Sequence, residues 1–333
     1  SSWRLEPLPA FAASGALHAS GFPDLAPCWL PGYLAHASAS LVGAVGAVAA
    51  WWQSALDEAP GSATIIELGC GNCSLLPAMV KSGLAGKYIG VDVARVSPST
   101  IAAQGLADSD IELVLHSETP AEEVPETDAC CDLAASVFGI EYSNLERSVP
   151  EAARLLKPGG RFFALLHHDN SIVTAMSKRA IDEFRQEDIQ KAVAALSTIS
   201  SERDRVRELS ELKSSTKAEE ARSLINSLAQ KYLSDTNPKT ANATMFEFMS
   251  QALRFFKMMG ASSEQRVDFI QSLETEHTAS HERFQQMVSV AFDADGIDNL
   301  KRLFVQSGFT EIAVGVVNTG DDILAWSLQA KIQ

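Results

Sequence analysis

Basic residues are scarce in this chain. Its 333 residues include 27 Lys and Arg against 42 Asp and Glu, which gives a formal net charge of −15. A protein that binds nucleic acid needs clustered Lys and Arg to neutralise phosphates, so this balance argues against DNA or RNA as a partner. A small-molecule substrate is the better interpretation, and the acidity itself mainly serves solubility.

Cysteines are also few, and their number is odd. An odd count of five in a long chain fits a reducing compartment better than a disulfide framework. Cys70 and Cys73 have the spacing of a redox pair, but small residues tolerated beside a ligand are the simpler interpretation. We therefore expect a cytoplasmic protein.

The sequence lacks a segment suited to a membrane. No basic stretch with a cleavage-site pattern opens the chain, so we expect no signal peptide. Residues 25–56 contain no Asp, Glu, Lys or Arg, but prolines and polar side chains dilute them. Their apolar centre, residues 41–52, is shorter than the roughly 20 residues that a spanning helix needs. A buried helix packed on a sheet edge is the better account, and we expect no membrane partner.

Strand and helix signals alternate over the following hundred residues. A β-branched apolar run at 64–68 leads into a loop with Gly69 and Gly71, a pattern typical of the carboxyl end of a strand. Further strands are predicted at 87–93, 111–115, 131–138 and 161–167, with helices at 74–82, 97–105 and 144–156. Lys157-Pro158-Gly159-Gly160 predicts a stop and a turn before the fifth strand.

The character of the chain changes between residues 170 and 293. Lys, Glu, Arg, Gln and Leu dominate, and their periodicity predicts helices at 178–196, 202–233, 244–259 and 264–290. Ser262 and Gln265 have the spacing of a capping box. A helix at 297–308 and a strand pair at 310–317 and 322–330 then restore the α/β pattern. The helical block is therefore predicted to be an insertion over the carboxyl edge of the sheet, where ligands bind in such folds.

Four motifs occur in an order that resembles one enzyme family. They are Glu67-Leu68-Gly69-Cys70-Gly71-Asn72, Tyr88-Ile89-Gly90-Val91-Asp92, Cys131-Asp132-Leu133, and Glu151-Ala152-Ala153-Arg154-Leu155-Leu156-Lys157-Pro158-Gly159-Gly160 before a strand. Together they resemble the class I S-adenosylmethionine-dependent methyltransferases over roughly residues 60 to 170 and 295 to 330. The resemblance implies an α/β fold, with a Rossmann-like, mostly parallel seven-stranded methyltransferase sheet that has an antiparallel last strand. A large all-helical insertion follows the fifth strand.

Three parts of the chain are expected on this basis. Residues 1–60 would form an N-terminal arm and a helix that covers the cofactor site. Residues 61–170 and 294–333 would form the Rossmann-like domain that binds S-adenosylmethionine. Residues 171–293 would form a helical lid, which is also a candidate interface for a homodimer.

The resemblance also assigns residues to the cofactor S-adenosylmethionine. Those expected to contact it are Glu67, Gly69, Cys70, Gly71, Asp92, Val93, Ser117, Glu118 and Phe138. Glu67, Gly69 and Gly71 would lie along its amino-acid portion, and Asp92 would accept hydrogen bonds from both ribose hydroxyls. Val93 would pack on the adenine, Ser117 or Glu118 would meet the adenine amine, and Phe138 would border the methionine arm. A departure from the family pattern is Cys73, which occupies the third small position of the loop.

Methyl transfer requires that a nucleophile be aligned and, where needed, that its proton be removed. The catalytic candidates follow the fourth and fifth strands and are Tyr142, His167 and His168. Histidine suits general-base work because its unperturbed pKa lies near neutrality. The alternative is that one histidine is a packed strand residue and that the other caps the following helix.

Further residues are candidates for contacts with the acceptor. They are Tyr33, Glu141, Asn144, His277 and His281. His277 and His281 are four residues apart, so both can face the same way from a helix. Such a pair can ligate a metal, although two histidines in a solvated helix are more often surface residues. A contact with the acceptor is favoured over a metal site, and we expect no metal site.

The leading hypothesis is a methyltransferase for a small-molecule acceptor, a secondary metabolite, that is enclosed beneath a helical lid. A second hypothesis is a non-methylating enzyme that cyclises the aminobutyryl arm of the cofactor and releases methylthioadenosine. A third is a non-catalytic binding or scaffold protein. Incubation with the cofactor alone separates the first two, and calorimetry with the cofactor tests the third.

Overall fold

The computed structural model describes residues 46–57, 59–73, 75–96, 106–237 and 239–333. These residues form two compact units, which are described separately. The sheet unit holds the described residues up to Met176 together with Gln286–Gln333, and the helical unit holds Ser177–Gln285. Residues 1–45 of the N-terminal arm and helix predicted for residues 1–60, and the helix predicted at 97–105, lie outside the described residues.

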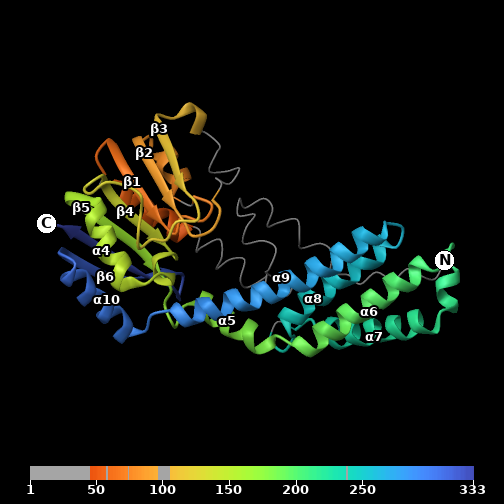
Figure 1. Cartoon of the computed structure of the whole chain (residues 1–333). Helices are drawn as coiled ribbons and strands as arrows, with labels where there is room; N and C mark the ends of the chain where they lie inside the picture. Colours follow the sequence, from red (N-terminus) through yellow and green to blue (C-terminus); the bar gives the residue numbers. More distant parts are fainter. Residues whose placement is uncertain (1–45, 58, 74, 97–105, 238) are drawn as a thin grey trace. The chain divides into compact units, whose positions relative to one another are not determined.

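The sheet unit is built on one seven-stranded sheet with the strand order β3-β2-β1-β4-β5-β7-β6 (Figure 1). Its strands are β1 (Ser62–Leu68), β2 (Ala85–Val91), β3 (Ile111–His116), β4 (Cys131–Val137), β5 (Leu156–Leu166), β6 (Phe309–Thr319) and β7 (Asp322–Ile332). The first five strands pair in parallel, and β7 is antiparallel to both of its neighbours. The predicted fold class, an α/β methyltransferase sheet with an antiparallel last strand, is confirmed.

Apolar side chains cover both faces of the sheet, as expected for parallel strands. Alternate residues of β5 point to opposite faces, so Phe162 joins one core and Phe163 joins the other. The first core is completed by α4 (Leu145–Leu155) and α10 (Ala294–Gln306). The second is completed by α2 (Leu76–Ser82) and by the helical residues 46–56, which contribute Trp52. Packing on both faces leaves the carboxyl edge of the sheet to carry function.

The predicted turn at residues 157–160 lies inside a strand. β5 begins at Leu156, and its pairing with β4 jumps from Cys131–Leu156 to Leu133–Arg161. Gly159 has φ +82°, which suits the bulge between these two pairs. The stop signal in the sequence therefore marks a bulge at the amino end of β5, and the prediction that the strand begins at residue 161 is wrong.

The helical unit contains more breaks than the sequence periodicity predicts. It comprises part of α5 (Ile172–Glu183), α6 (Gln186–Asp204), α7 (Thr216–Leu233), α8 (Ala243–Ala252) and part of α9 (Ser263–Val290), with 3₁₀ turns at Glu211–Ser214 and Leu253–Met258. The prediction of one helix at 178–196 is wrong, because the Asn242 side chain donates to the carbonyl of Glu183 at 2.8 Å where α5 ends. The prediction of one helix at 202–233 is also wrong. Ser215 caps α7, with its hydroxyl oxygen 3.2 Å from the amide nitrogen of Ala218.

The start of α9 agrees with the sequence. The amide of Gln265 donates to the Ser262 hydroxyl oxygen at 3.2 Å, and the Ser262 amide donates to the Gln265 side chain at 3.1 Å. These two bonds are the reciprocal pair of a capping box, so that prediction is confirmed. Among the described helices, none is long and apolar enough to cross a membrane.

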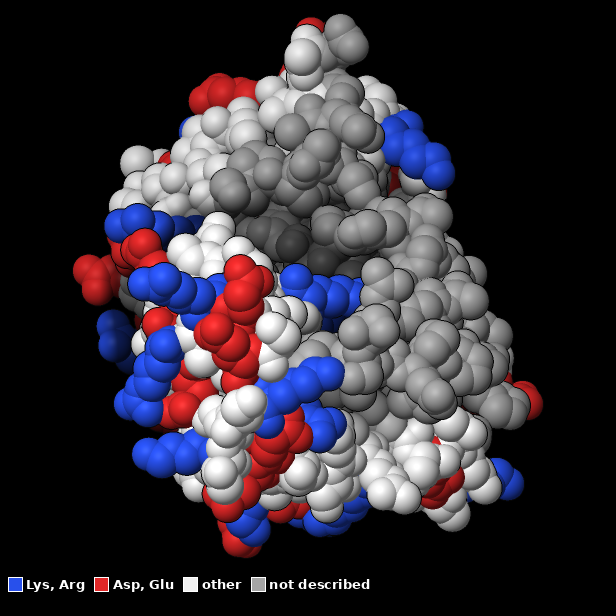
Figure 2. All heavy atoms as spheres, turned by 90° about the vertical axis from the view of Figure 1, so that its right-hand side faces the viewer, with Lys and Arg blue, Asp and Glu red and all other residues white. Residues whose placement is uncertain are grey.

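The helical unit has an apolar core of its own. Ile189, Leu196, Ile225 and Phe248 are fully buried in it. The buried Arg266 is bonded to Asp204 and to the Ser200 hydroxyl, so its charge is compensated. On the face shown in Figure 2, Lys and Arg side chains are interspersed with Asp and Glu, and the described residues in this view form no extended basic patch.

Candidate cofactor and acceptor site

The carboxyl ends of β1 and β2 are joined through the glycine loop. The backbone amides of Gly69 and Cys70 both donate to the carbonyl of Val91, at 2.9 and 3.0 Å. The loop that follows β1 therefore folds over the end of β2, next to Asp92. This places two of the sequence motifs at one edge of the sheet.

The two glycines of this loop have different roles. A Cβ on Gly69 would lie 2.7 Å from the Cα of Gly139, and a Cβ on Gly139 would lie 2.8 Å from the carbonyl oxygen of Leu68. Gly69 therefore permits backbone packing between the loops after β1 and β4. A Cβ on Gly71 would meet no atom of the described residues within 4 Å, although its φ is +49°. Only Gly71 leaves open space where a ligand could approach the backbone.

Glu67 is fully buried at the end of β1. Its carboxylate accepts hydrogen bonds from the Tyr88 hydroxyl and from the amide of Leu75, the latter at 3.2 Å. This carboxylate therefore holds the loop in shape. Cys70 and Cys73 are buried free thiols in the same loop. A direct contact of Glu67 or Cys70 with the cofactor stays a prediction.

Asp92 follows β2 and fixes the backbone on both sides of it. Its Oδ2 accepts from the amide of Gly71 and its Oδ1 from the amide of Ala94, both at 2.8 Å. Each carboxylate oxygen has a second lone pair, so the half-exposed side chain can still accept from two ribose hydroxyls. Val93 is 70% exposed beside it and is available to pack on an adenine ring.

The loop after β3 carries the two residues predicted to meet the adenine amine. The Ser117 hydroxyl oxygen accepts from the amide of Val96 at 2.9 Å. Glu118 has φ +56°, its amide donates to the carbonyl of Ala94 at 3.1 Å, and its carboxylate lies 3.6 Å from Nε of Arg95. Both residues therefore lie beside the Asp92 turn, and their contact with adenine stays a prediction.

The loops after β4 and β5 bring together three of the residues predicted from the sequence. The Phe138 ring stacks on the His167 ring, with centroids 4.6 Å apart. The Tyr142 hydroxyl lies 3.1 Å from Nε2 of His167. Tyr142 is 44% exposed whereas His167 is only 4% exposed, so the hydroxyl is the accessible end of the pair.

Burial controls the protonation of this pair. It lowers the pKa of His167 to about 4 and, together with the nearby Glu141 carboxylate, raises the pKa of Tyr142 above its usual value. At neutral pH the imidazole is therefore uncharged and the phenol keeps its proton. The tautomer of the neutral imidazole sets the direction of the hydrogen bond between the Tyr142 hydroxyl and Nε2.

Glu141 lies beneath this pair and is 5% exposed. Its Oε1 accepts from the backbone amide of His167 at 3.1 Å, which ties the loop after β4 to the end of β5. Burial raises the pKa of Glu141 to about 7, and bonds from backbone amides partly offset that rise. Because Glu141 precedes Tyr142 in the chain, its bond to the His167 amide also keeps Tyr142 close to His167.

His168 and Asn144 have other partners. The His168 ring stacks on Trp326 with centroids 4.3 Å apart, and its Nδ1 accepts from the amide of Asn170 at 3.0 Å. Burial lowers the pKa of His168, an effect that Asp169 opposes. The Asn144 side chain caps α4 by accepting from the amide of Glu146 at 3.1 Å. The structure thus assigns to His168 and Asn144 contacts that support the chain around the site.

The remaining candidates are in the helical unit or outside the described residues. The His277 ring meets the Phe248 ring edge-on at 5.0 Å, and burial lowers the pKa of His277 to about 4. The His281 ring stacks on Phe184 at 4.0 Å. Tyr33 lies outside the described residues. Within the described parts of the chain, no group of three or more His, Cys, Asp or Glu side chains is placed to hold a metal ion.

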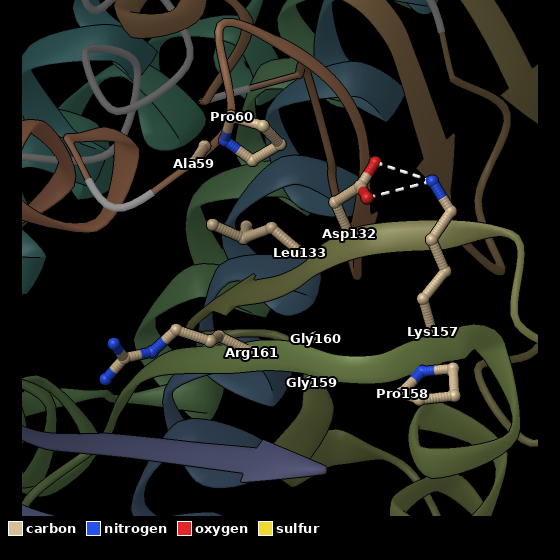
Figure 3. Close-up of a pocket in the computed structure, with 9 residues that line it drawn as sticks. All are labelled: Ala59, Pro60, Asp132, Leu133, Lys157, Pro158, Gly159, Gly160 and Arg161. Carbon is tan, nitrogen blue, oxygen red and sulfur yellow. Dashed lines mark hydrogen bonds and ion pairs between the residues drawn. The ribbon is translucent and has the colours of Figure 1, made fainter. Parts of the chain in front are cut away.

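A pocket of about 200 Å³ opens at the other end of β4 and β5 (Figure 3). It is lined by Ala59, Pro60, Asp132, Leu133, Lys157, Pro158, Gly159, Gly160 and Arg161. Nζ of Lys157 donates to both carboxylate oxygens of Asp132, at 2.8 and 2.9 Å, across this pocket. It lies at the amino ends of the strands, whereas the site residues follow the carboxyl ends, so it is no part of the cofactor site.

The sequence did not predict the roles of Gly139 and Tyr88, which support the loop after β1 from behind the site. Gly139 packs on Gly69, and Tyr88 donates to the buried Glu67. A lone glycine after a strand carries no specific signal. Tyr88 lies inside a predicted strand and pairs with Ile65 of β1. Its hydroxyl, a polar group in an otherwise apolar strand, was the only sign in the sequence of a buried hydrogen-bond partner.

Comparison with known proteins agrees with this geometry. Residues 66–164 match the sequence model of a family described as a methyltransferase domain, and the match runs from β1 into β5. This part of the chain is therefore similar to a methyltransferase domain, and it lies on the seven-stranded, mostly parallel sheet. No curated protein matches the chain.

Several solved structures are similar to parts of the chain. A complex of a methyltransferase with its activator from Haloferax volcanii is 24% identical, over 35% of this chain and 52% of that one, with a TM-score of 0.27. Geranyl diphosphate C-methyltransferase from Streptomyces coelicolor is 20% identical, over 36% and 45%, with a TM-score of 0.29. A methyltransferase from Thermotoga maritima is 12% identical, over 86% and 89%, with a TM-score of 0.34. This chain spans about half the length of the first two structures.

Proposed function

We propose that the protein is a methyltransferase that transfers the methyl group of S-adenosylmethionine to a small-molecule acceptor. The observation that carries this proposal is the Tyr142–His167 pair, whose Oη and Nε2 atoms are 3.1 Å apart. The pair follows β4 and β5 at the same edge of the sheet as Asp92 and Gly71. A nucleophile held there would be close to the reactive end of a cofactor bound along the glycine loop.

The bound cofactor supplies a methyl group on a sulfonium, which transfers with its bonding electron pair left on sulfur. The chain's own residues position the nucleophile and handle its proton. The exposed Tyr142 hydroxyl can accept a hydrogen bond from the acceptor while donating to His167, and Phe138 packs on the imidazole and keeps water from its face. Because burial makes His167 a weak base, we expect the pair to remove the proton of the acceptor late in the reaction, after methyl transfer has begun.

A small acceptor is supported by the charge and by the insertion. The net charge of −15 disfavours polyanionic substrates, and Ser177–Gln285 separate the two halves of the sheet in sequence. We propose that the helical unit acts as a lid and that His277 and His281 contact the acceptor, which would be a product of secondary metabolism. A homodimer through this unit and a cytoplasmic location complete the proposal, the latter supported by free thiols at every described cysteine.

The proposal is tested by incubating the full chain with isotopically labelled S-adenosylmethionine and a library of small hydroxyl, amine and carbon nucleophiles. Mass spectrometry should show labelled product together with S-adenosylhomocysteine. Methylthioadenosine in the absence of any acceptor would instead establish the cyclising reaction. Absence of binding to the cofactor and to S-adenosylhomocysteine would favour a scaffold.

Tyr142→Phe gives the mechanistic test of the same proposal. The variant loses the hydroxyl that meets the acceptor, so kcat should fall roughly 100-fold while the KM for the cofactor stays nearly unchanged. Tyr232→Phe, which removes a hydroxyl bonded to Asp188 in the helical unit, is the matched control. An unchanged kcat in Tyr142→Phe would remove the pair from the mechanism.

A further inference from the structure

Glu141 is a buried acid without a counter-charge. It is 5% exposed and takes part in no ion pair among the described residues. Its contacts are the backbone amides of Gly139, Glu141 and His167, and its Oε2 has no hydrogen-bond partner of its own in the described structure. A buried carboxylate that is neither paired nor fully bonded is rare, because burial disfavours the charged form.

The position of Glu141 links it to both halves of the site. Two residues before it, Gly139 packs directly on Gly69 of the cofactor loop. Its Oε1 binds the amide of His167, whose ring lies between Phe138 and Tyr142. The acid therefore lies behind the region where the loops after β1, β4 and β5 meet. A positive charge on a ligand there would interact with it across buried protein, where screening by water is weak.

We propose that Glu141 is the counter-charge for the sulfonium of the bound cofactor and that it selects S-adenosylmethionine over its neutral thioether product. This inference rests on the proposed function. Transfer of the methyl group removes the positive charge from sulfur, so the interaction with Glu141 is present before the reaction and absent after it. The same acid would then help the product to leave.

The titratable groups that face Glu141 do not supply this charge. Tyr142 on its own turn and His167 at the end of β5 are both neutral at pH 7, as their shifted pKa values require. No charged side chain of β1, β4 or α4 contributes to the shift at Glu141. The protein thus leaves the positive partner to a ligand.

Isothermal titration calorimetry on the full chain tests the proposal with three probes. S-adenosylmethionine and sinefungin carry a positive group at or beside the sulfur position, and S-adenosylhomocysteine carries none. In Glu141→Gln, an amide oxygen can still accept from His167 while the charge is lost. Kd for the two cationic probes should rise roughly tenfold or more, while Kd for S-adenosylhomocysteine changes less than about twofold.

The outcomes separate this proposal from the proposed function. Equal weakening of all three probes, or no weakening, would show that Glu141 only holds the backbone. Failure of the wild-type chain to bind any of them would instead overturn the proposed function. Glu146→Gln, an exposed acid in the first turn of α4, is the matched control and should leave all three Kd values unchanged.

A second measurement needs no variant. Because the pKa of Glu141 is about 7, the acid gains its charge as the pH rises from 6 to 7.5. Over that interval the preference of the wild-type chain for S-adenosylmethionine over S-adenosylhomocysteine should increase severalfold. If the preference of the wild-type chain does not change with pH, the proposal is contradicted, even if Glu141→Gln does not fold. If Glu141→Gln folds, its preference should not change with pH.

Discussion

The two glycines after β1 show how the same residue type meets different physical demands. Gly69→Ala would place a Cβ 2.7 Å from the Cα of Gly139, at a residue whose φ is +70°. The loops after β1 and β4 would have to separate to relieve this contact, which costs free energy of folding. We predict a loss of about 3 kcal/mol in the free energy of unfolding, from crowding and left-handed strain together. Urea denaturation measures it.

Gly71→Ala is the matched control at the neighbouring glycine. Its Cβ would meet nothing, so only the strain at φ +49° remains, about 1 kcal/mol. The new methyl group would project into the space left for a ligand, and cofactor affinity should fall at least roughly tenfold. If both variants lose the same free energy of unfolding, the close contact between Gly69 and Gly139 is not the reason why position 69 requires glycine.

Asp92→Ala is predicted to abolish measurable cofactor binding. The change removes the acceptor for the ribose hydroxyls, and it also frees the amides of Gly71 and Ala94. We therefore expect a stability loss of about 1–2 kcal/mol besides the loss of binding, without unfolding at 25 °C. Calorimetry with S-adenosylhomocysteine and urea denaturation check both parts. An unchanged affinity would mean that the ribose is bound elsewhere.

At the scale of elements, the turn after β4 makes stability depend on pH. The folded pKa of Glu141 is about 7, above the value of about 4.5 expected in the unfolded chain, so the folded state holds the extra proton between these limits. Its contribution to stability is therefore present below about pH 4.5 and is lost as the pH rises to 7. His167 has the opposite sign, because its folded pKa of about 4 makes stability rise with pH up to about 6.5.

Glu141→Gln isolates the first of these effects. We predict that the variant gains stability relative to the wild type as the pH rises from 4.5 to 8, by up to about 3 kcal/mol. Urea denaturation of both chains at pH 5 and pH 8, followed on the transition of the sheet unit, gives the difference. A constant difference across that range would show that the acid is not titrating there.

The elements of the sheet could be predicted from the sequence, but several breaks in the helices could not. Apolar runs such as Ile65–Leu68 indicate buried strands by themselves, and the capping box at Ser262 marks the start of α9 by local chemistry. The end of α5 depends on Asn242, which is about sixty residues away in sequence. Local periodicity carries no trace of such a tertiary hydrogen bond.

The candidate site divides in the same way. Tyr142 and His167 were predicted because both follow strands whose carboxyl ends share an edge, and the fold brings them to 3.1 Å. The contact of His168 with Trp326 could not be predicted, because it depends on the pairing of β5 with β7. The burial of Glu141 is likewise a result of packing around the turn and not of its sequence neighbours.

At the scale of the whole molecule, the two units have separate apolar cores. The cores on the two faces of the sheet contain Phe162 and Phe163, and the helical unit buries Phe248 and Phe255 in its own core. We predict two transitions in differential scanning calorimetry of the full chain. S-adenosylhomocysteine at 100 times its Kd should stabilise the sheet unit by about 2.7 kcal/mol and raise only its transition, by a few degrees. A single transition, or equal shifts of both, would show that the units unfold together.

Within residues 106–237 and 239–333, the chain passes from the sheet unit to the helical unit and back again, and both passages lie within helices. Met176 and Ser177 are consecutive residues of α5, and Gln285 and Gln286 are consecutive residues of α9. The sheet is completed independently of what lies between them, because β5 pairs with β7 over Arg161–Leu166. A change in the length of the segment 177–285 would therefore leave the strand pairs of the sheet with the same partners. The family match ends at residue 164, inside β5, and therefore includes no residue of this segment.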